Sequence, residues 1–237
     1  MSTLPEDTAP DGRVQDDTAP DGRAPDDKAP RSRKGAETRA RLIDAAKDVF
    51  ERRGFLEARV SDIAEQAKLS HGSFYHYFES KEQVFREVAE AQEANLTAPS
   101  DDDHDGLGEL DRLYRANLRY LERYRANGRI MGVIEEVSRY DPEVGAARMA
   151  RQKHFADRAE RSIRRLQGAG HADGDVDPEI AALALGSMVA RSAEMWLVEG
   201  WGDYDIEHMA AQITRLWANA IGLGPSGDGI RAPGRRA

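Results

Sequence analysis

The segment VSDIAEQAKLSHGSFYHYF, from Val60 to Phe78, decides the fold that we expect for this chain. Two short helices joined by a tight turn need a small residue where they cross and apolar residues on their inward faces. Ala64 is the small residue, and Ser70 has the hydroxyl that favours the start of a second helix. The pattern therefore predicts a helix-turn-helix unit. Its other inward positions are apolar: Ile63, Ala67, Leu69, Phe74 and Tyr77.

One helix is expected on each side of this unit. Before it, the apolar residues of segment 36–53 fall on one helical stripe, and Gly54 stands where a glycine commonly ends a helix. After it, Ser80-Lys-Glu-Gln83 has the spacing of a capping box, which predicts the start of a fourth helix. The stripe of the first helix consists of Leu42, Ala45, Ala46, Val49 and Phe50.

The second half of the chain repeats apolar residues at spacings of three and four, which predicts helices and no strands. Two of these helices open with Asp-Pro-Glu, at Asp141 and Asp177, so that a capping carboxylate precedes a proline in the first turn. The last helix carries an apolar stripe over 206–221. The expected fold is all-α, with an N-terminal three-helix helix-turn-helix domain over 35–80 and a helical-bundle domain over 81–223.

Both ends of the chain are expected to lie outside the packed domains. The sequence DTAPDGR at 7–13 returns at 17–23 and, degraded, at 27–31. Such a Pro-, Gly- and Asp-rich repeat buries too little apolar surface to offset the entropy of ordering it. Residues 1–34 are therefore predicted to be a disordered tail that ends in a basic arm, with a partner-binding tail as the alternative. Segment 224–237 is predicted to be a flexible tail.

Charge is unevenly distributed along the chain. The formal net charge is −9, yet residues 31–81 carry eleven basic and eight acidic side chains. Residues 1–30, by contrast, carry eight acidic and three basic side chains. The basic block thus coincides with the helix-turn-helix, which favours contact with a nucleic acid.

The composition also argues against several other classes of protein. Cysteine is absent, so disulfides and thiolate metal sites are excluded. The first thirty residues contain no apolar run of signal-peptide length, and no later run reaches the roughly 18 uninterrupted apolar residues of a membrane span. We expect a cytoplasmic protein with no membrane partner.

The motifs around the turn are more specific than apolar spacing alone. They are Gly54-Phe55, Val60-Ser-Asp-Ile-Ala-Glu-Gln-Ala67, Leu69-Ser70, His71-Gly-Ser-Phe-Tyr-His-Tyr-Phe78 and Ser80-Lys-Glu82. Together, over residues 36–85, they resemble the N-terminal domain of TetR-family bacterial transcription regulators. The chain departs from that pattern twice. Ala58 stands where the family usually has a helix-capping Thr that touches a phosphate. Lys68 stands where the turn usually has Gly, so we expect a turn backbone that either tolerates a side chain or accepts some strain.

The resemblance implies that the second helix of the unit enters the major groove of a double-stranded DNA operator. Residues at its start would lie nearest the base edges: Ser70, His71, Gly72 and Ser73. Phosphate contacts are implied for Tyr75, His76 and Lys81, and Arg59 or Ser61 would bind the phosphate that Ala58 cannot reach. The arm, with Arg33 and Lys34, would follow the backbone or enter a minor groove. For each of these residues the alternative is a solvated surface position.

The helix over 180–197 is apolar nearly all round, so it must be buried on more than one side. In TetR-like proteins the last two helices form a four-helix bundle with a second subunit, which implies a homodimer. We expect the stripe of the last helix, including Ile213 and Leu216, at that interface.

The resemblance also implies a small-molecule site between the fifth and eighth helices. Core packing explains the apolar members of the expected lining equally well, and snorkelling or an internal salt bridge is the expected role of Arg148 nearby. The expected lining is Tyr114, Asn117, Leu118, Leu121, Met131, Ile134, Gln152, Phe155, Met195 and Trp196.

The function expected from these features is a ligand-responsive transcription regulator. It would be a repressor that a small apolar or amphipathic effector releases from a palindromic operator. One alternative is a ligand-independent regulator of the same fold. A helical-bundle enzyme is disfavoured, because the sequence shows no convergent catalytic set and no metal-ligating histidine spacing; we expect no cofactor and no metal.

Overall fold

The computed structural model describes residues 32–98 and 106–223. Within these ranges the chain is helical and contains no strand, which confirms the all-α prediction. The predicted disorder of residues 1–30 and of 224–237 concerns segments outside the described residues. The helices are α1 (Arg33–Glu57), α2 (Val60–Gln66), α3 (His71–Phe74), α4 (Lys81–Thr97), α5 (Glu109–Ala126), α6 (Gly128–Val137), α7 (Pro142–Gly168), α8 (Pro178–Leu197) and α9 (Ile206–Ala220).

Helix α1 starts earlier than its apolar stripe suggested. The Ser32 hydroxyl accepts a hydrogen bond from the Gly35 amide at 3.1 Å and so caps the helix. Arg33 and Lys34 consequently lie in the first turn of α1, and the prediction that they form a separate basic arm is wrong. At the other end, Gly54 has φ +71° and ψ 177°, which breaks the helix as predicted, but the chain then adds one more turn.

The helix-turn-helix forms through the predicted local signals. The Ser70 hydroxyl accepts from the Ser73 amide at 3.1 Å, which starts α3. Helix α3 is shorter than expected and continues as turns to Phe78, whose amide bonds the Phe74 carbonyl at 3.0 Å. Five side chains close the core of this unit, each at most 2 % exposed: Ile63, Ala64, Ala67, Phe74 and Phe78.

The start of α2 shows what stands in for the family's threonine. Ala58 is buried, and alanine has no hydroxyl that could accept a hydrogen bond from a backbone amide at the start of α2. The Asp62 carboxylate instead accepts from the Arg59 amide at 3.3 Å and forms an ion pair with Arg53 at 3.6 Å. Asp62 therefore caps α2 from within its own first turn.

The turn between α2 and α3 carries the strain that its sequence predicts. Lys68 has φ +55°, and within 32–98 and 106–223 it is the only residue other than glycine with positive φ. The Leu69 amide donates to the Ala64 carbonyl at 2.8 Å, which closes the end of α2 around this residue. The backbone adopts the left-handed conformation although a side chain is present.

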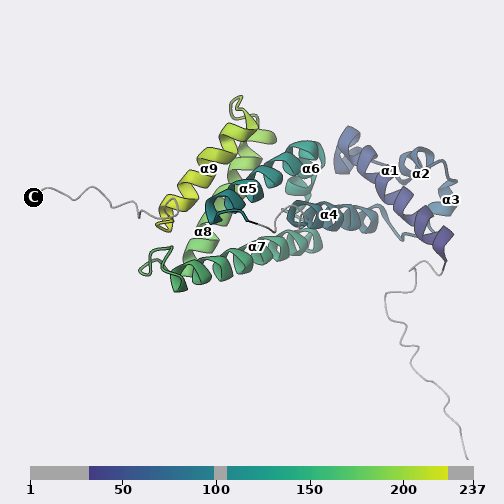
Figure 1. Ribbon diagram of the computed structural model, residues 1–237. Helices are drawn as coiled ribbons and strands as arrows, with labels where there is room; N and C mark the ends of the chain where they lie inside the picture. The colour runs from purple at the N-terminus through teal and green to yellow at the C-terminus, as the bar shows by residue number, and fades with distance from the viewer. Residues whose placement is uncertain (1–31, 99–105, 224–237) are drawn as a thin grey trace, which may run out of the picture.

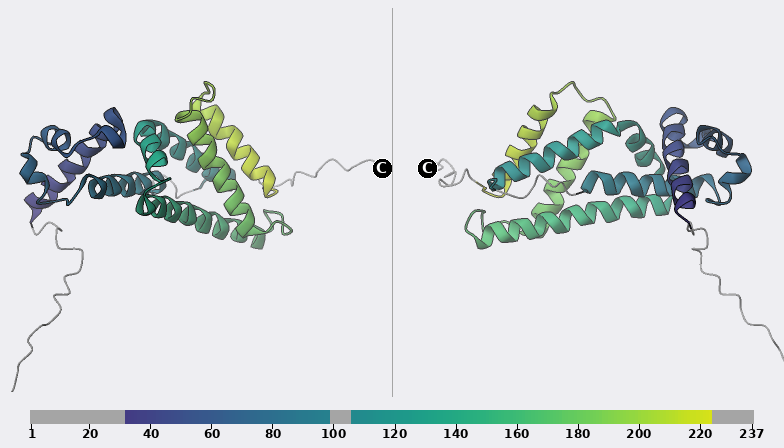
Figure 2. Two further views of the ribbon diagram at one scale, coloured as in Figure 1. Left: turned by 180° about the vertical axis from the view of Figure 1, so that it is seen from behind. Right: turned by 45° about the vertical axis from the view of Figure 1, so that its right-hand side comes forward.

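Helix α4 runs from the helix-turn-helix into the second domain (Figure 1). Near its start, the Phe85 ring packs against Phe50 and Phe55 of α1, with ring centroids 5.0 and 4.9 Å apart. Farther along, α4 lies beside α7, which in turn packs on α8, while α5 packs on α9 (Figure 2). The two domains are thus joined through one continuous helix.

Helix α8 is long and apolar enough for a membrane span by length and composition, with a mean hydropathy of 1.2. Among the described helices it alone passes this test, which core helices of water-soluble proteins also pass. Its inner side is buried in the subunit through Ala182, Leu185 and Ala193. Ile180 and Leu183, one turn apart, are 66 % and 63 % exposed, so α8 has an uncovered apolar side.

The stripe of α9 packs inside the subunit, contrary to our expectation. Ile213 is 3 % exposed and faces the core beside α5, where Thr214 accepts a hydrogen bond from Asn117 at 2.9 Å. Leu216 points away from that core and is 56 % exposed. The apolar periodicity identified the buried face of α9 but not the element that buries it.

Replacing Lys68 with glycine should stabilise the protein. Glycine adopts positive φ without a steric penalty, so Lys68→Gly should raise the free energy of unfolding by about 1 kcal/mol. Urea denaturation of the two proteins measures this difference. Lys68→Ala is the matched control, since alanine retains Cβ and should give no comparable gain. A glycine variant no more stable than the alanine variant would show that the turn is not strained.

Candidate functional site

One side of the helix-turn-helix presents the predicted DNA-contacting residues to solvent. Ser70, His71, Gly72, Tyr75 and His76 are exposed on and just after α3. A Cβ atom added to Gly72 would meet no atom within 4 Å, so the surface is open at that point. The structure therefore gathers these residues at one short helix, with the Tyr75 ring edge-on to His71 at 5.3 Å.

Two of the side chains predicted to contact DNA form hydrogen bonds within the protein. The Ser73 hydroxyl is half-buried and lies 2.7 Å from that of Ser70. The Lys81 ammonium donates to the carbonyls of Phe55 and Leu56 at 2.8 and 3.3 Å and lies over the Phe55 ring. Lys81 thus ties the start of α4 to the end of α1, and an ammonium with three donors retains one for a phosphate.

The remaining predicted DNA contacts lie at two helix starts. Arg59 and Ser61 are exposed where α2 begins. Arg33 and Lys34 are exposed in the first turn of α1, where Arg33 forms an ion pair with Glu37 at 3.0 Å.

The residues predicted to line a ligand site are mostly packed in the core of the second domain. Leu121, Met131 and Ile134 have no exposed surface, and Asn117 is bonded to Thr214. Trp196 is 9 % exposed, while the others are partly buried: Tyr114, Leu118, Gln152, Phe155 and Met195. Their ligand role stays a prediction.

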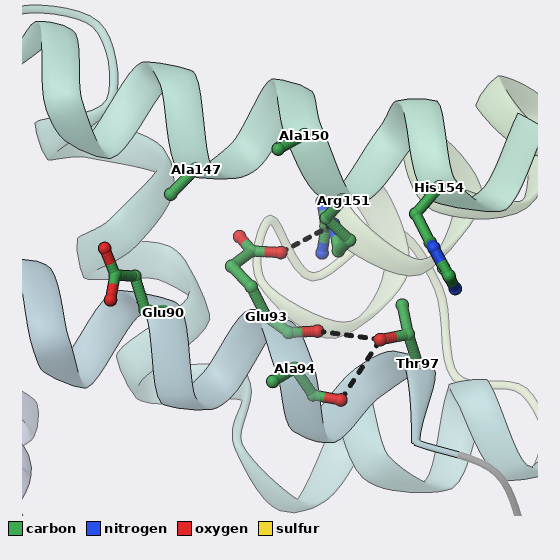
Figure 3. Close-up of a pocket in the computed structure, with 8 residues that line it drawn as sticks. All are labelled: Glu90, Glu93, Ala94, Thr97, Ala147, Ala150, Arg151 and His154. Atoms are coloured by element: carbon green, nitrogen blue, oxygen red, sulfur yellow. Dashed lines mark hydrogen bonds and ion pairs between the residues drawn. The ribbon is translucent and has the colours of Figure 1, made fainter.

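A pocket of about 370 Å³ lies between α4 and α7 (Figure 3), and none of those ten residues lines it. Its base is an ion pair between Glu93 and Arg151, with Oε2 and Nε 2.6 Å apart and both side chains at most 5 % exposed. Glu90 and His154 are exposed at its rim. The remaining lining residues are small or short: Ala94, Thr97, Ala147 and Ala150.

Behind this pair, further charges from α6, α7 and α8 complete what we call the buried ionic cluster: Glu93, Glu135, Arg148, Arg151 and Glu194. Arg148 lies 2.5 Å from Glu135 and 3.7 Å from Glu194, which bears out the internal salt bridge expected for it. Glu194 also pairs with Arg191 at 2.8 Å.

Several buried polar atoms around the cluster lack hydrogen bonds. The hydroxyls of Tyr120 and Tyr124, both carboxylate oxygens of Glu93, and Nε and Nη1 of Arg151 have no hydrogen-bond partner within the described residues. Glu93 and Arg151 are thus in ionic contact without aligned donors and acceptors. Buried polar atoms that lack a partner cost roughly 1–3 kcal/mol each, so a site that retains them commonly serves a function.

Burial dominates the electrostatics of the cluster. Desolvation raises the pKa of Glu93 to about 6, although the Arg151 charge opposes the rise. Desolvation also raises the pKa of Glu135, against the charge of Arg148, and that of Tyr120 to about 12. Groups so perturbed beside a pocket are candidates for a binding site.

Polar contacts join α4 and the helix-turn-helix to the second domain. Arg86 of α4 pairs with Asp141, which caps α7, at 3.2 Å and with Glu143 at 2.8 Å. Lys47 of α1 donates to Asn127, just before α6, at 2.9 Å. A change in the position of α4 would therefore reach both domains.

Comparisons of the sequence and of the structure with known proteins both find bacterial transcription regulators. Residues 42–88 match the family model described as bacterial regulatory proteins, tetR family. The HTH-type transcriptional regulator YdgC of Bacillus subtilis is 26 % identical over 200 residues, which are 84 % of this chain and 98 % of YdgC. Residues 42–88 are thus a DNA-binding domain of the TetR family.

Two solved structures of TetR-fold regulators superpose on most of the chain. MexZ, described as a key repressor responsible for antibiotic resistance in Pseudomonas aeruginosa, has a TM-score of 0.62 at 21 % identity and covers 81 % of this chain and 96 % of its own. FadR of Bacillus subtilis, solved in complex with stearoyl-CoA, has a TM-score of 0.65 at 17 % identity and covers 77 % and 98 %.

The family match and the sequence relatives identify the protein as a DNA-binding transcription regulator and not an enzyme. His71 and Gly72 of α3 are exposed, as the prediction that α3 is the recognition helix requires. Among the described residues, no group of three or more His, Cys, Asp and Glu side chains could hold a metal ion.

Sequence reasoning missed the buried ionic cluster except for the salt bridge of Arg148. A signal was present, because Glu93 stands between Ala89 and Leu96 on the apolar stripe of α4, where a solvated side chain has no place. Its partner Arg151 lies 58 residues along the chain, a pairing that periodicity within one helix does not show.

The raised pKa of Glu93 predicts a pH-dependent stability difference. Between pH 4.5 and about 6 the folded protein holds a proton that the unfolded chain releases, so rising pH disfavours folding in this window. The free energy of unfolding of wild type relative to Glu93→Gln should therefore fall by about 2 kcal/mol between pH 4.5 and 7.5. Urea denaturation across this range measures the effect. Ala94→Ser should differ from wild type by a constant amount, and an equally constant difference for Glu93→Gln would contradict the assignment.

Proposed function

We propose that this protein represses transcription as a homodimer on a palindromic operator and leaves the DNA when a small apolar or amphipathic effector binds its α4–α9 domain. The observation that carries the proposal is that α4 packs against the helix-turn-helix at Phe85 and contributes Glu93 to the pocket. The similarity to MexZ, described as a repressor, and to FadR, solved with stearoyl-CoA, supports this proposal.

Recognition of DNA would use the exposed side of α3. In the major groove, His71, Gly72 and Ser73 would lie nearest the base edges, with Ser70 at the helix start. Tyr75, His76 and the free donor of Lys81 would contact phosphates. Arg59, Ser61, Arg33 and Lys34 would add contacts to the sugar–phosphate backbone from the starts of α2 and α1.

Specific recognition of an operator would need two copies of α3, because a four-residue helix contacts few base pairs. A homodimer with two-fold symmetry would place its recognition helices roughly 34 Å apart, one turn of DNA. The uncovered apolar residues Ile180 and Leu183 of α8 and Leu216 of α9 support the last two helices as the interface.

Release of DNA would follow from a shift of α4. An effector that binds in the pocket better in one position of α4 than in another necessarily favours that position. Arg86 and Lys81 connect the start of α4 to α7 and to α1, so the shift would reorient the recognition helices.

The DNA contacts predict two kinds of mutant. With an operator selected from randomised DNA, Tyr75→Phe should weaken binding to all sequences by roughly tenfold, because it removes one hydrogen bond to a phosphate. Ser73→Ala should instead change the preference between operators, by about 1–3 kcal/mol for each base that it no longer recognises. Fluorescence anisotropy with matched and altered operators measures both. Uniform weakening by Ser73→Ala, or altered preference with Tyr75→Phe, would reverse our orientation of α3.

The dimer interface predicts opposite results at two neighbouring positions of α9. Leu216→Glu places a charge on the exposed side, so it should separate the subunits and reduce operator affinity while each subunit stays folded. Ile213→Glu buries a charge in the core and should unfold the protein. Sedimentation and thermal melting distinguish the two. A folded, dimeric Leu216→Glu protein with full operator affinity would exclude this face as the interface.

A further inference from the structure

The pocket between α4 and α7 carries more carboxylates than cations. Glu90 and Glu93 line it together with one guanidinium, that of Arg151, and His154 is counted as neutral. Behind the base, Glu135 and Glu194 face Arg148. One carboxylate is in excess even when Arg191, which pairs with Glu194 from the exposed side of α8, is included.

The carboxylate at the base is poorly satisfied. Glu93 is 5 % exposed, and its oxygens accept no well-aligned hydrogen bond from the described residues, although the Arg151 guanidinium lies within hydrogen-bond distance. Arg151 approaches to 2.6 Å, but its Nε and Nη1 donate no aligned hydrogen bond. A buried carboxylate in this state is stabilised by any donor group that forms a well-aligned hydrogen bond with it. A planar cation that forms two parallel hydrogen bonds stabilises it most.

Aromatic groups stand behind the pair. Tyr120 of α5 is 5 % exposed, its hydroxyl has no partner within the described residues, and its pKa responds to the charges of Arg151 and Glu93. The Tyr120 ring packs edge-on against Phe155 of α7, with centroids 5.5 Å apart.

We propose that this pocket binds an organic cation, an amidinium, guanidinium or ammonium group on a compact apolar body, which pairs with Glu93 in place of Arg151. Glu90 attracts the charge at the rim, and the wall formed by Ala94, Ala147 and Ala150 receives the apolar body. The inference rests on the proposed function, since it names the chemical class of the effector.

An anionic ligand fits the same pocket poorly. It would have to compete with Glu93 for Arg151, and the displaced Glu93 would then join an excess of buried carboxylates. Removing the partner of a buried charge is strongly unfavourable. A cation displaces Arg151 instead, and the long Arg151 side chain, 4 % exposed in the ion pair, would have to turn toward solvent at the rim of the pocket.

Displacement of Arg151 also explains how the ligand would act on α4. The Glu93–Arg151 pair links α4 to α7 in the interior. Once a ligand replaces Arg151, the ion pairs that still join α4 to the start of α7 within the described residues are those of Arg86 with Asp141 and Glu143.

Three probes of the same shape test the charge preference: benzamidine, benzamide and benzoate, which are cationic, neutral and anionic. Calorimetric titration into the full-length protein without DNA should give a dissociation constant for benzamidine at least tenfold lower than for benzamide, and no binding of benzoate. Equal affinity of benzamidine and benzamide, or tighter binding of benzoate, would overturn the proposal.

Two variants locate the site. Glu90→Gln, at an exposed position, should weaken benzamidine binding several-fold and leave thermal melting unchanged. Arg151→Met removes the internal competitor for Glu93 and should strengthen benzamidine binding, whereas a site for anions would be lost. Glu122→Gln, on an exposed position of α5, is the control and should bind as wild type does. Should Arg151→Met fail to fold, Glu90→Gln decides alone, and unchanged benzamidine affinity in that variant would overturn the site.

Adding benzamidine to the protein–operator complex separates this inference from the proposed function. Benzamidine that binds the protein but leaves the operator bound would support the cation site and contradict the proposed release mechanism. A protein that binds its operator and takes up no benzamidine would overturn the cation site and leave DNA recognition intact.

Discussion

Phe85 and Glu93 lie on the same helix, about 12 Å apart along its axis at 1.5 Å per residue, yet they belong to different cores. The Phe85 ring fills an aromatic cluster with α1, while the Glu93 carboxylate reaches the interior of the second domain. Helix α4 therefore has to satisfy two packing environments with one rigid backbone. The placement of α3 relative to the pocket depends on this helix, together with the packing of α1 on α6.

The features that were predicted from the sequence are encoded within a few residues. Ser70, Ser80, Asp141 and Asp177 each cap the helix that follows, because capping needs only a side chain and an amide two or three positions away. The conformation of Lys68 follows equally from the short α2–α3 connection. Local chemistry of this kind can be predicted without knowledge of the rest of the fold.

The features that were missed depend on contacts between distant segments. The stripe of α9 is equally compatible with α5 or with a second subunit as its partner, and only the tertiary arrangement places Ile213 against α5. Likewise, a glutamate on the apolar side of α4 indicates an unusual position, but Arg151 becomes its partner only when α7 packs alongside. The expected ligand lining followed apolar periodicity, and Leu121 and Met131 belong to the core for the same reason.

A helix shared by two cores also imposes a thermodynamic symmetry. If a ligand at Glu93 lowers affinity for the operator by a given factor, the operator must lower affinity for that ligand by the same factor. The two binding partners would thus compete although they bind at different elements, the operator at α3 and the ligand between α4 and α7 (Figure 1). Abundant operator DNA would make the protein a less sensitive detector, so the concentration of effector that triggers a response would depend on how many operator copies the cell contains.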